Sequence, residues 1–559
     1  MVTKGKRSVP AYLRRRIPLL IVIMAGVIAI IALRFYSKPI PEEKPTYKGT
    51  LRLGGLYKPD IINPILVNET ISATLMDMIF NGLVRLNDKF EPVPDLAESW
   101  DISGDGKVWT FHLRPGVKFH DGAELTSDDV LFTYQLITNP DIDSPWRSSY
   151  NLVERFETPD RYTFKVILKE PSALFLIRME REIVPKHILE GVNLRDTQFN
   201  RHPIGTGPFR FLKWDENGTI TLEANPEYFE GRPYLNRIVA YSNYNSLEHI
   251  WVHFIRDEVD LIWNMRFDDY RLIKDNPGFR TFVFIGNVYY ALGYNLKDPL
   301  LKDKRFRDAL AMGIDVQRMI KRVDKGYGSM EDGVGVRVTG PFHPNSWAFN
   351  NTVQPVPYKP REALKILKEL GYEDRDGDGF LDKDGKELSI RILVDLRDER
   401  MQRVFMSLHQ NLYEMGILLK PQVYDNDMKL REEFLDKGNF QTYLMIFQYA
   451  VDPDDAAKYW HSKGLVAEKW WGYNNPELDR LFDSGRVELD KDRRSKIYQE
   501  VHRIIYEDQT ALFLYSPFTF DGVSTKFGGV KRFSSYMPIW MLKDWYEVGM
   551  QVKNKRERG

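Results

Sequence analysis

Strand-like and helix-like apolar patterns alternate along this 559-residue chain from Gly49 onward. Apolar side chains occupy every second position in 109–113 and 162–168, which is typical of strands with one buried face. They recur every three or four positions in 306–314 and 363–370, which is typical of amphipathic helices. The sequence therefore predicts an α/β or α+β body, and no solenoid or coiled-coil period is visible. A chain of this length is expected to contain several folding units.

Two local signals refine this prediction. The turn-forming pair at 115–116, proline and glycine, interrupts an alternating apolar pattern, so the sequence predicts a β-hairpin over 109–119. Thr126 is followed three residues later by Asp129, which is a capping-box pattern at the start of a helix.

Composition excludes several classes of function. The chain contains no cysteine, which rules out thiol nucleophiles, cysteine-ligated zinc, iron–sulfur clusters and disulfides. Basic and acidic residues number 79 each, but the first 40 residues hold eight basic residues and no acidic one. The rest of the chain therefore carries an acidic excess, and we expect no nucleic-acid partner.

The N-terminal segment predicts a membrane anchor. Residues 17–33 form an uninterrupted run of 17 apolar residues, and residues 1–16 hold six basic ones. At about 1.5 Å per residue, a helix over 17–36 just spans a bilayer. Because cytoplasmic flanks are enriched in basic residues, we expect 1–16 in the cytoplasm, a transmembrane signal-anchor at 17–36 and a polar tether at 37–48 outside. The alternative is a cleaved secretory signal, although no convincing cleavage site follows the run.

Motifs for catalysis are missing. The sequence contains no G-x-S-x-G, H-E-x-x-H or Walker loop, so it predicts no enzyme and no cofactor. The run Gly205-Thr206-Gly207 lacks the third glycine of a dinucleotide site and predicts a tight turn. His249 and His253 have zinc-ligand spacing, but two histidines do not make a site, and a solvated amphipathic helix is the favoured interpretation.

One acidic loop has the spacing of a calcium site. Asp374, Asp376, Asp378 and Asp382 occupy the first, third, fifth and ninth positions, with a glycine at the sixth. Position 12 is Gly385, where an EF-hand has a bidentate glutamate. A weak calcium site and a plain acidic turn are the two alternatives.

Four segments of the chain resemble the signature sequences of one family. They lie at 79–134, 205–229, 289–315 and 471–479 and include the runs I-F-N-G-L-V-R, G-T-G-P-F-R-F and W-G-Y-N-N-P-E-L-D. In this order they closely resemble the extracytoplasmic solute-binding proteins of peptide/nickel-type ABC importers, known as solute-binding family 5. The resemblance covers the chain from about residue 50 to about residue 540.

The resemblance implies a two-lobe, periplasmic-binding-protein-like α/β fold with an extra subdomain in lobe one. Two crossing strands, near 285–295 and 512–520, are expected to join the lobes. The implied divisions are lobe one with its subdomain at 49–288, lobe two at 289–511, a return to lobe one at 512–550 and a charged tail at 551–559.

The implied function is that of the solute-binding subunit of an ABC importer. It would capture a peptide or similar oligomeric solute on the outer face of the cytoplasmic membrane by lobe closure and deliver it to the permease subunits. In peptide-binding relatives, an aspartate three residues before a D-P-D-like motif pairs with the α-ammonium group of the peptide. Here Tyr449 occupies that position ahead of Asp452, so the amine anchor is missing. Asp452 could substitute from a shifted backbone, or the ligand could be uncharged, such as a glycan or a blocked peptide.

Seven residues are expected to line the pocket. They are Phe447, Tyr449 and Asp452 from lobe two, Tyr290 and Asn295 at the crossing, and Trp263 and Thr206 from lobe one. Core packing is the alternative role for each aromatic residue, and turn formation is the alternative for Thr206.

Two other functions are compatible with the sequence. A membrane-tethered sensory or scaffold protein could use the same binding fold, although the 16 residues ahead of the apolar run are too few for a cytoplasmic output domain. An extracytoplasmic hydrolase is the third hypothesis, but the sequence supplies no catalytic constellation for it.

Overall fold

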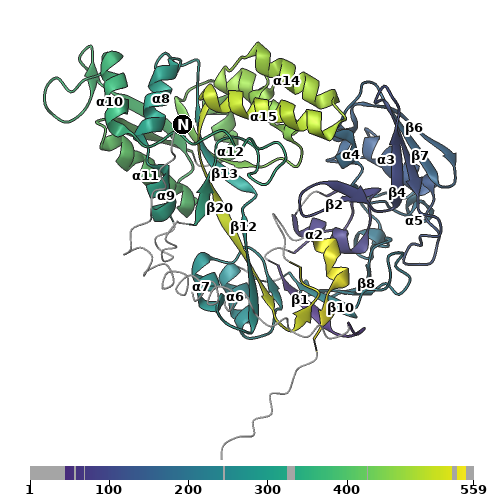
Figure 1. Cartoon of the computed structure of the whole chain (residues 1–559). Helices are drawn as coiled ribbons and strands as arrows, with labels where there is room; N and C mark the ends of the chain where they lie inside the picture. The colour runs from purple at the N-terminus through teal and green to yellow at the C-terminus, as the bar shows by residue number, and fades with distance from the viewer. Residues whose placement is uncertain are drawn as a thin grey trace, which may run out of the picture. The chain divides into compact units, whose positions relative to one another are not determined.

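A single strand of 14 residues, β20 (Ala511–Ser524), takes part in both halves of a 12-stranded sheet (Figure 1). In this computed structural model its first part pairs antiparallel with β13 (Val288–Tyr294), and its second part pairs with β12 (Phe279–Ile285). Every residue of β20 is buried or half-buried. The strand therefore links two groups of strands, which form the sheets of lobe one and lobe two, and β13 and β20 occupy the segments predicted to cross between lobes.

The structure describes residues 45–55, 58–67, 70–242, 244, 246–323, 334–424, 426–531 and 538–548. Residues 46–547 form one compact unit, and of the second unit, 1–45 with 548–559, only Pro45 and Val548 are described. The predicted anchor at 17–36 and the charged tail lie outside the described residues. Within the described ranges, no helix is both long and apolar enough to cross a membrane. The residue boundaries proposed for the domains stay a prediction.

Lobe one contains the other end of the main sheet. β1 (Thr50–Gly54) pairs parallel with β10 (Arg237–Tyr241), since the chain crosses to a separate subdomain between them. Leu51, Leu53 and Ile238 point into the core of this lobe. The remaining elements of the sheet and its covering helices are β8 (Phe209–Trp214), β9 (Ile220–Ala224), β11 (Leu261–Ile262), α6 (Leu247–Ile255) and α7 (Phe267–Ile273).

The subdomain of lobe one contains a four-stranded antiparallel sheet in the order β4-β5-β7-β6. Helix α3 (Ser127–Thr138) packs on this sheet, where Tyr134 stacks on Phe156 and Phe164 with ring centroids 5.6 Å apart in each pair. The predicted capping box is confirmed, because the Asp129 carboxylate accepts from the backbone N–H of Thr126 at 2.9 Å. The strands are β4 (Ala97–Ile102), β5 (Val108–Leu113), β6 (Val153–Asp160) and β7 (Thr163–Leu168).

The hairpin predicted over 109–119 is wrong. Its first strand exists as β5, but both edges of β5 are occupied by β4 and β7. Residues beyond the proline–glycine turn make only an isolated bridge between Lys118 and Glu124. The alternating pattern identified a buried strand, and it carried no information about which partners that strand has.

Other elements of lobe one connect the subdomain to the main sheet. Helix α2 (Thr70–Ile79) leads into the hairpin of β2 (Val84–Leu86) and β3 (Pro92–Pro94). The short helices α4 (Phe175–Arg178) and α5 (Lys186–Leu189) follow β7. The C-terminal end of the described chain adds η7 (Ile539–Asp544) and a bridge between β21 (Phe527–Gly528) and β22 (Tyr546–Glu547).

Lobe two packs helices on both faces of the strands β18-β17-β19-β13. The helices predicted over 306–314 and 363–370 are confirmed as α8 (Lys304–Gly313) and α10 (Pro360–Glu369). Gly371 follows α10 with a φ of 94°, a left-handed conformation that glycine adopts without strain. The strands are β14 (Gly335–Arg337), β17 (Ser389–Val394), β18 (Leu418–Val423) and β19 (Thr442–Gln448), with a small hairpin of β15 (Asp382–Lys383) and β16 (Lys386–Glu387).

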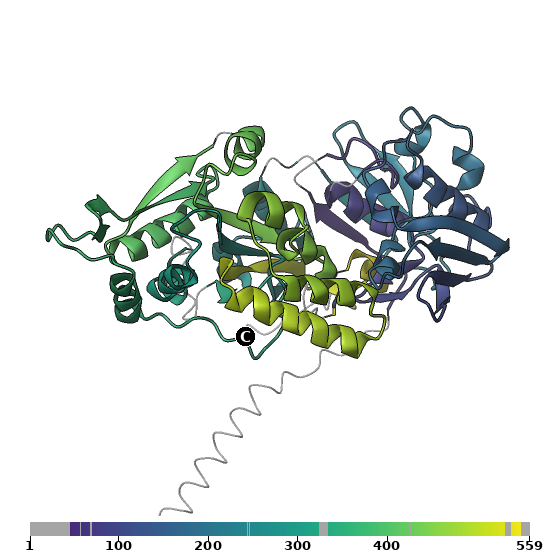
Figure 2. The ribbon, with the colours of Figure 1, turned by 90° about the horizontal axis from the view of Figure 1, so that it is seen from above.

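The second helical layer of lobe two comes from the C-terminal part of the chain. Helices α14 (Pro476–Val487) and α15 (Lys491–Glu507) run side by side (Figure 2). The other helices of this lobe are α9 (Val316–Val323), α11 (Glu399–Tyr413), α12 (Asp427–Lys429) and α13 (Ala457–Trp460), with short 3-10 or π turns at Leu430–Leu435, Pro453–Ala456 and Ala467–Trp471.

Candidate functional site

Strand β19 and the residue that follows it place two of the aromatic residues expected to bind ligand on the buried side of the sheet. Phe447 and Tyr449 point into the aromatic core of lobe two. Side chains of a strand alternate between its two faces, so Ile446 and Gln448 point the other way. Ile446 is 43% exposed and Gln448 is also exposed. At this end of β19, solvent therefore reaches Ile446 and Gln448 rather than the two predicted aromatic residues.

Tyr449 is part of an aromatic cluster. Its ring lies 4.8 Å from that of Tyr289 and 5.0 Å from that of His343, centroid to centroid. Burial raises the pKa of the Tyr449 phenol, so the side chain stays uncharged at physiological pH. Tyr449 therefore supplies no negative charge at the position where the resemblance led us to expect an aspartate.

Asp452 is bonded to its own chain. Both of its carboxylate oxygens accept from the Arg494 guanidinium, at 2.6 and 2.7 Å, and both side chains are almost completely buried. Asp452 also caps the turn that follows, because it accepts from the backbone N–H of Asp454 at 2.9 Å. The neighbouring Asp454 accepts from Arg486 and Tyr498, each at 3.0 Å. This pair of carboxylates holds the 453–456 turn against α14 and α15.

Three other predicted residues are buried, and the fourth is half-buried. Tyr290 stacks on Tyr515 with centroids 5.0 Å apart, and the Asn295 amide donates to the Phe440 carbonyl at 2.9 Å. Thr206 donates to the Asn81 side chain at 3.1 Å. Trp263 is half-buried against the core of lobe one.

The glycines beside Thr206 explain that turn. A Cβ atom at either Gly205 or Gly207 would collide with the backbone at Ile79, so only glycine permits this close approach. The structure brings Phe447 and Tyr449 together in one aromatic core of lobe two, whereas Tyr290 lies opposite Ile446 and belongs to another core. Thr206 and Trp263 belong to lobe one. Ligand contact by the seven residues stays a prediction.

Polar contacts join the subdomain of lobe one to lobe two. The backbone N–H of Ala173 donates to the Arg486 carbonyl at 2.8 Å. Arg178 donates to Asp455 at 3.1 Å, and their side chains are 31% and 33% exposed. The Lys491 ammonium pairs with Glu91. These contacts place α4 and the β2–β3 hairpin against the 453–456 turn and the start of α15.

A second group of charged residues lies next to this junction, on lobe one. Asp77 on α2 is exposed and has no hydrogen bond or ion pair with any other described residue. Glu180 and Glu182 flank Arg181, whose guanidinium lies 2.9 Å from Glu180 and 3.8 Å from Glu182. Desolvation and the nearby Glu182 and Glu180 raise the pKa of Asp77 well above its usual value. We call Asp77, Glu180, Arg181 and Glu182 the lobe-one acidic cluster.

Sequence reasoning missed this cluster. Asp77 lies about 100 residues before the consecutive Glu180, Arg181 and Glu182, so no spacing rule connects it to them. One signal was available, because Asp77 is the lone charged residue in the otherwise uncharged segment 70–84. A single charge in such a run indicates either a paired core residue or a group that faces a binding site.

Comparison with known proteins identifies the family. Residues 91–466 match the sequence signature of the bacterial extracellular solute-binding proteins, family 5 (middle region). The chain belongs to this family. The oligopeptide-binding protein AppA of Bacillus subtilis (strain 168) is 29% identical over 483 residues, which cover 85% of this chain and 87% of AppA. The di/tripeptide-binding protein 2 of Pseudomonas aeruginosa (strain UCBPP-PA14) is 26% identical over 476 residues, covering 78% of this chain and 84% of that protein.

The solved structures support the fold of this family 5 protein. The structure of AppA from Bacillus subtilis in complex with a nonapeptide superposes with a TM-score of 0.68 at 28% identity, covering 90% of this chain and 100% of that chain. The two-lobe solute-binding fold and the family predicted from the sequence are thus confirmed. The matched family and these relatives are solute-binding proteins and not enzymes.

The histidine pair of this family 5 protein borders a cavity in lobe one. His249 and His253 lie on α6 as predicted, and His253 hydrogen-bonds to Glu258. Among the described residues, these groups do not converge to metal-binding distances. The cavity of about 530 Å³ is lined by Asn217, Thr219, Tyr241, Tyr244, His249, His253 and Glu258.

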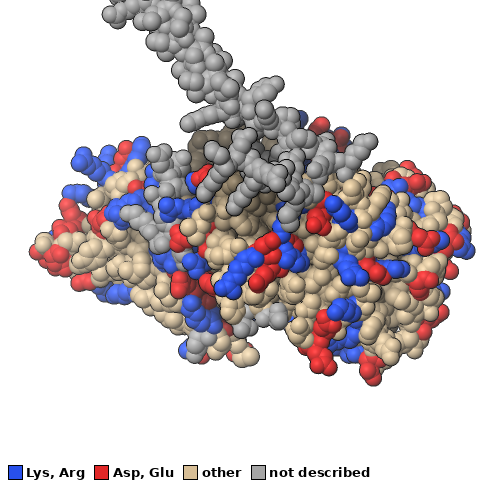
Figure 3. Space-filling view, turned by 90° about the horizontal axis from the view of Figure 1, so that it is seen from below, with Lys and Arg blue, Asp and Glu red and all other residues tan. Residues whose placement is uncertain are grey.

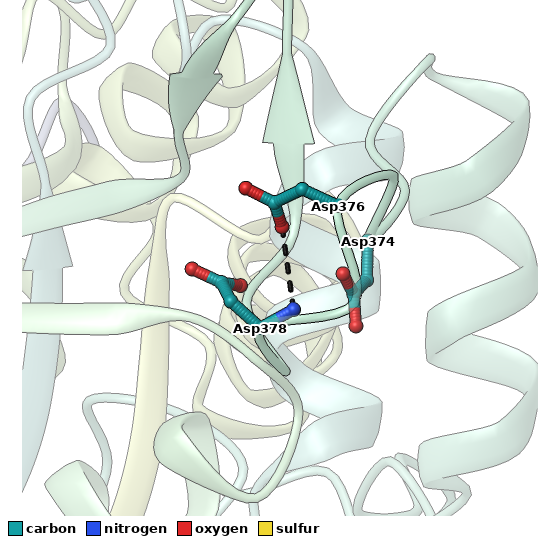
Figure 4. A group of neighbouring side chains, drawn as sticks. All are labelled: Asp374, Asp376 and Asp378. Carbon is teal, nitrogen blue, oxygen red and sulfur yellow. Dashed lines mark hydrogen bonds between the residues drawn. The ribbon is translucent and has the colours of Figure 1, made fainter.

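The acidic loop of lobe two brings three carboxylates together (Figure 4). Asp374, Asp376 and Asp378 are exposed, and one oxygen from each lies within 4.8 Å of the others. Asp376 accepts from the backbone N–H of Asp378 at 3.3 Å, and Asp382 accepts from the N–H of Arg375 at 3.1 Å. These bonds are those of a folded acidic turn, and calcium binding stays a prediction.

Charged side chains elsewhere are mixed in sign. On the face in Figure 3, lysine and arginine are interspersed with aspartate and glutamate between uncharged residues. This distribution fits the equal totals of basic and acidic residues.

Proposed function

We propose that this family 5 protein is the solute-binding subunit of an ABC importer for peptides, acting outside the cytoplasmic membrane. The observation that carries the proposal is the family signature at 91–466, which extends across elements of both lobes. AppA and the di/tripeptide-binding protein, by their names, bind peptides. Capture followed by delivery to a permease accounts for this fold better than a sensory or scaffold role, for which the described residues offer no specific feature.

Capture works by closure of the lobes around the peptide. The ion pairs described between the lobes are partly exposed, and exposed ion pairs contribute about 0.2–1 kcal/mol each. Shifting a two-state equilibrium from about 1:99 to about 99:1 takes roughly 5.5 kcal/mol of differential binding. The bound peptide therefore supplies most of the free energy of closure by contacting both lobes.

The peptide contacts lobe two at the exposed end of β19. Ile446 and Gln448 are accessible there, while Phe447 and Tyr449 support the strand from behind. Tyr290, on the adjacent strand β13, lies opposite Ile446 in the sheet. In this arrangement the predicted aromatic residues determine the shape of the site and contribute no charged group to it.

The segment at 17–36 holds the protein on the membrane as a signal-anchor, with 1–16 in the cytoplasm. The support is the apolar run of 17 residues preceded by six basic ones. N-terminal sequencing of the exported protein tests this part: an intact Met1 or Val2 end supports the anchor, and a new end beyond residue 33 shows cleavage.

Native mass spectrometry of the freshly purified protein tests the main proposal. We expect retained peptide, or a mass increase on adding a peptide mixture, together with a smaller radius of gyration by X-ray scattering. Absence of peptide binding across lengths from two to nine residues, with a folded protein, would overturn the proposal.

A further inference from the structure

The lobe-one acidic cluster has an excess of negative charge beside the junction between lobes. It contains three carboxylates, from Asp77, Glu180 and Glu182, and one guanidinium, from Arg181. Arg181 also lies over the Trp146 ring, 4.1 Å from its centroid. With all groups ionised the cluster carries a net charge of two negative units.

Backbone hydrogen bonds bring the cluster together. Leu83 N–H donates to the Met179 carbonyl at 3.0 Å, and Ile183 N–H donates to the Asn81 carbonyl at 2.9 Å. These bonds hold the segment after α2 beside the segment that carries Glu180 and Glu182. Asp77, about one helical turn before Asn81, is therefore placed next to the two glutamates.

One oxygen of the cluster is buried without a hydrogen bond. Glu182 is 7% exposed, and its Oε2 atom has no hydrogen-bond partner; the nearest cation, Arg181, is 3.8 Å away. A buried carboxylate oxygen without a donor costs free energy that a bound donor would recover. Independently of the net charge, this oxygen indicates that the cluster can accept a hydrogen bond from a bound donor.

Asp77 is both accessible and desolvated. Its side chain is exposed to solvent, yet surrounding protein disfavours its charged form. Arg178, two residues before Glu180, reaches Asp455 of lobe two, so the cluster lies beside the contact between lobes.

The geometry favours an organic cation over a metal ion. Among the described residues, carboxylates converge to within 4.8 Å only in the loop of Asp374, Asp376 and Asp378. The carboxylates of the lobe-one cluster are spread more widely. An ammonium or guanidinium group has several donors and can bridge acceptors that are too far apart to share one metal ion.

We propose that Asp77, supported by Glu180 and Glu182, binds the cationic group of the peptide, on lobe one rather than at the position of Tyr449 in lobe two. The inference rests on the proposed function and names the chemistry of the ligand: a peptide with a free amino terminus or a basic side chain. The carboxylates accept hydrogen bonds from the cation, and the cation balances the negative charge of the cluster.

Calorimetric titration with four nonapeptide probes tests this inference, since a nonapeptide is bound in the AppA structure. The first probe is polyalanine with one central lysine and a free amino terminus. The second has the amino terminus acetylated, the third has norleucine in place of lysine, and the fourth carries both changes. All four end in a carboxyl-terminal amide, so that the fourth probe is uncharged. The second and third probes show whether the cation comes from the side chain or from the terminus.

Asp77→Asn is compared with the unmodified full-length protein. For the probe that retains the recognised cation, we expect the affinity of the variant to be at least about tenfold lower than that of the unmodified protein. For the fourth, uncharged probe, we expect the two proteins to have the same affinity. Asp77→Glu, which keeps the charge, should retain the preference for the cationic probe. Glu369→Gln on α10 removes an exposed carboxylate outside the cluster and should change none of the affinities.

Each outcome decides the inference. Equal affinity losses of Asp77→Asn for charged and uncharged probes, or no loss at all, would overturn it while leaving the proposed function intact. If the unmodified protein binds the uncharged probe as tightly as the charged ones, the inference also fails. If the unmodified protein binds none of the probes, the proposed function fails for these peptides and the inference falls with it. The midpoint of thermal unfolding separates a binding defect from misfolding.

Discussion

Two groups of carboxylates lie on either side of the junction between lobes, and their surroundings are opposite. In lobe two, Asp452 and Asp454 are bonded to Arg494, Arg486 and Tyr498 and are nearly inaccessible. In lobe one, Asp77 is exposed and unpaired among the described residues, with two glutamates nearby sharing one arginine. The difference shows that a carboxylate close to a binding site is available to a ligand only if its own chain has not already neutralised it.

The D-P-D segment of lobe two illustrates the consequence. Its sequence made Asp452 a candidate ligand residue, yet its carboxylate is almost completely buried and is already balanced by a buried guanidinium, so it offers a peptide neither access nor uncompensated charge. Four predictions test how far the contrast between the two groups extends.

The largest effect is expected from Arg494→Met. This change leaves Asp452 buried without a cation and should lower the free energy of unfolding by about 3–5 kcal/mol, measured by urea denaturation. Arg493→Met is the matched control, because Arg493 is on the same helix but pairs with Glu488 at the surface, and it should change stability little. Equal effects of the two substitutions would contradict a structural role for the Asp452–Arg494 pair.

Asp521 extends the comparison to a carboxylate that is buried and forms no ion pair with the other described residues. It accepts from the N–H of Asn264 at 3.0 Å, and burial raises its pKa to about 7, compared with about 3.9 in an unfolded chain. The folded state then binds the extra proton between these values, so stability decreases as pH rises through this window, by up to about 1.4 kcal/mol per pH unit.

Asp521→Asn should make the stability of the protein less dependent on pH between about pH 4 and about pH 7. Urea denaturation of both proteins at several pH values measures the two slopes. Asp95, whose pKa is also raised to about 7 by burial, remains in both proteins and therefore cancels in the difference. Identical slopes would show that Asp521 is ionised in the folded protein.

Binding of cationic peptides should weaken at low pH. The pKa of Asp77 is raised by desolvation and by Glu182, Glu180 and Asp95, while Arg181 opposes the shift. Below this pKa the ionised form decreases about tenfold per pH unit, so affinity for a cationic probe should fall by up to that factor. Calorimetry at descending pH measures it. The uncharged probe should show no such decrease, and Asp77→Asn should flatten the profile for the cationic one.

The smallest effect is expected at the rim of the junction. Lys491→Ala removes the ion pair with Glu91 and should weaken peptide affinity by up to about 1 kcal/mol, roughly fivefold, because this pair forms between lobes. The effect should shrink at high salt. Lys496→Ala, an exposed lysine farther along the same helix, is the control and should leave affinity unchanged. Equal affinities for the two variants would show that the rim pair does not contribute to closure.

Local features of the fold could be read from the sequence because neighbouring residues determine them. The capping box at Thr126 and Asp129, the strand at 108–113 and the helix that ends before Gly371 all involve residues a few positions apart. The family itself followed from four ordered motifs. The hairpin partner of 108–113 did not follow, because strand pairing depends on distant segments.

The sequence by itself determined that this is a cysteine-free α/β binding protein of family 5 without the anchoring aspartate at position 449. The tertiary structure decided which face of β19 is accessible and which carboxylates are already paired. Arg494 lies 42 residues after Asp452, and Glu182 comes from a different segment than Asp77. Charge compensation in a protein depends on distance in space, and only the fold sets that distance.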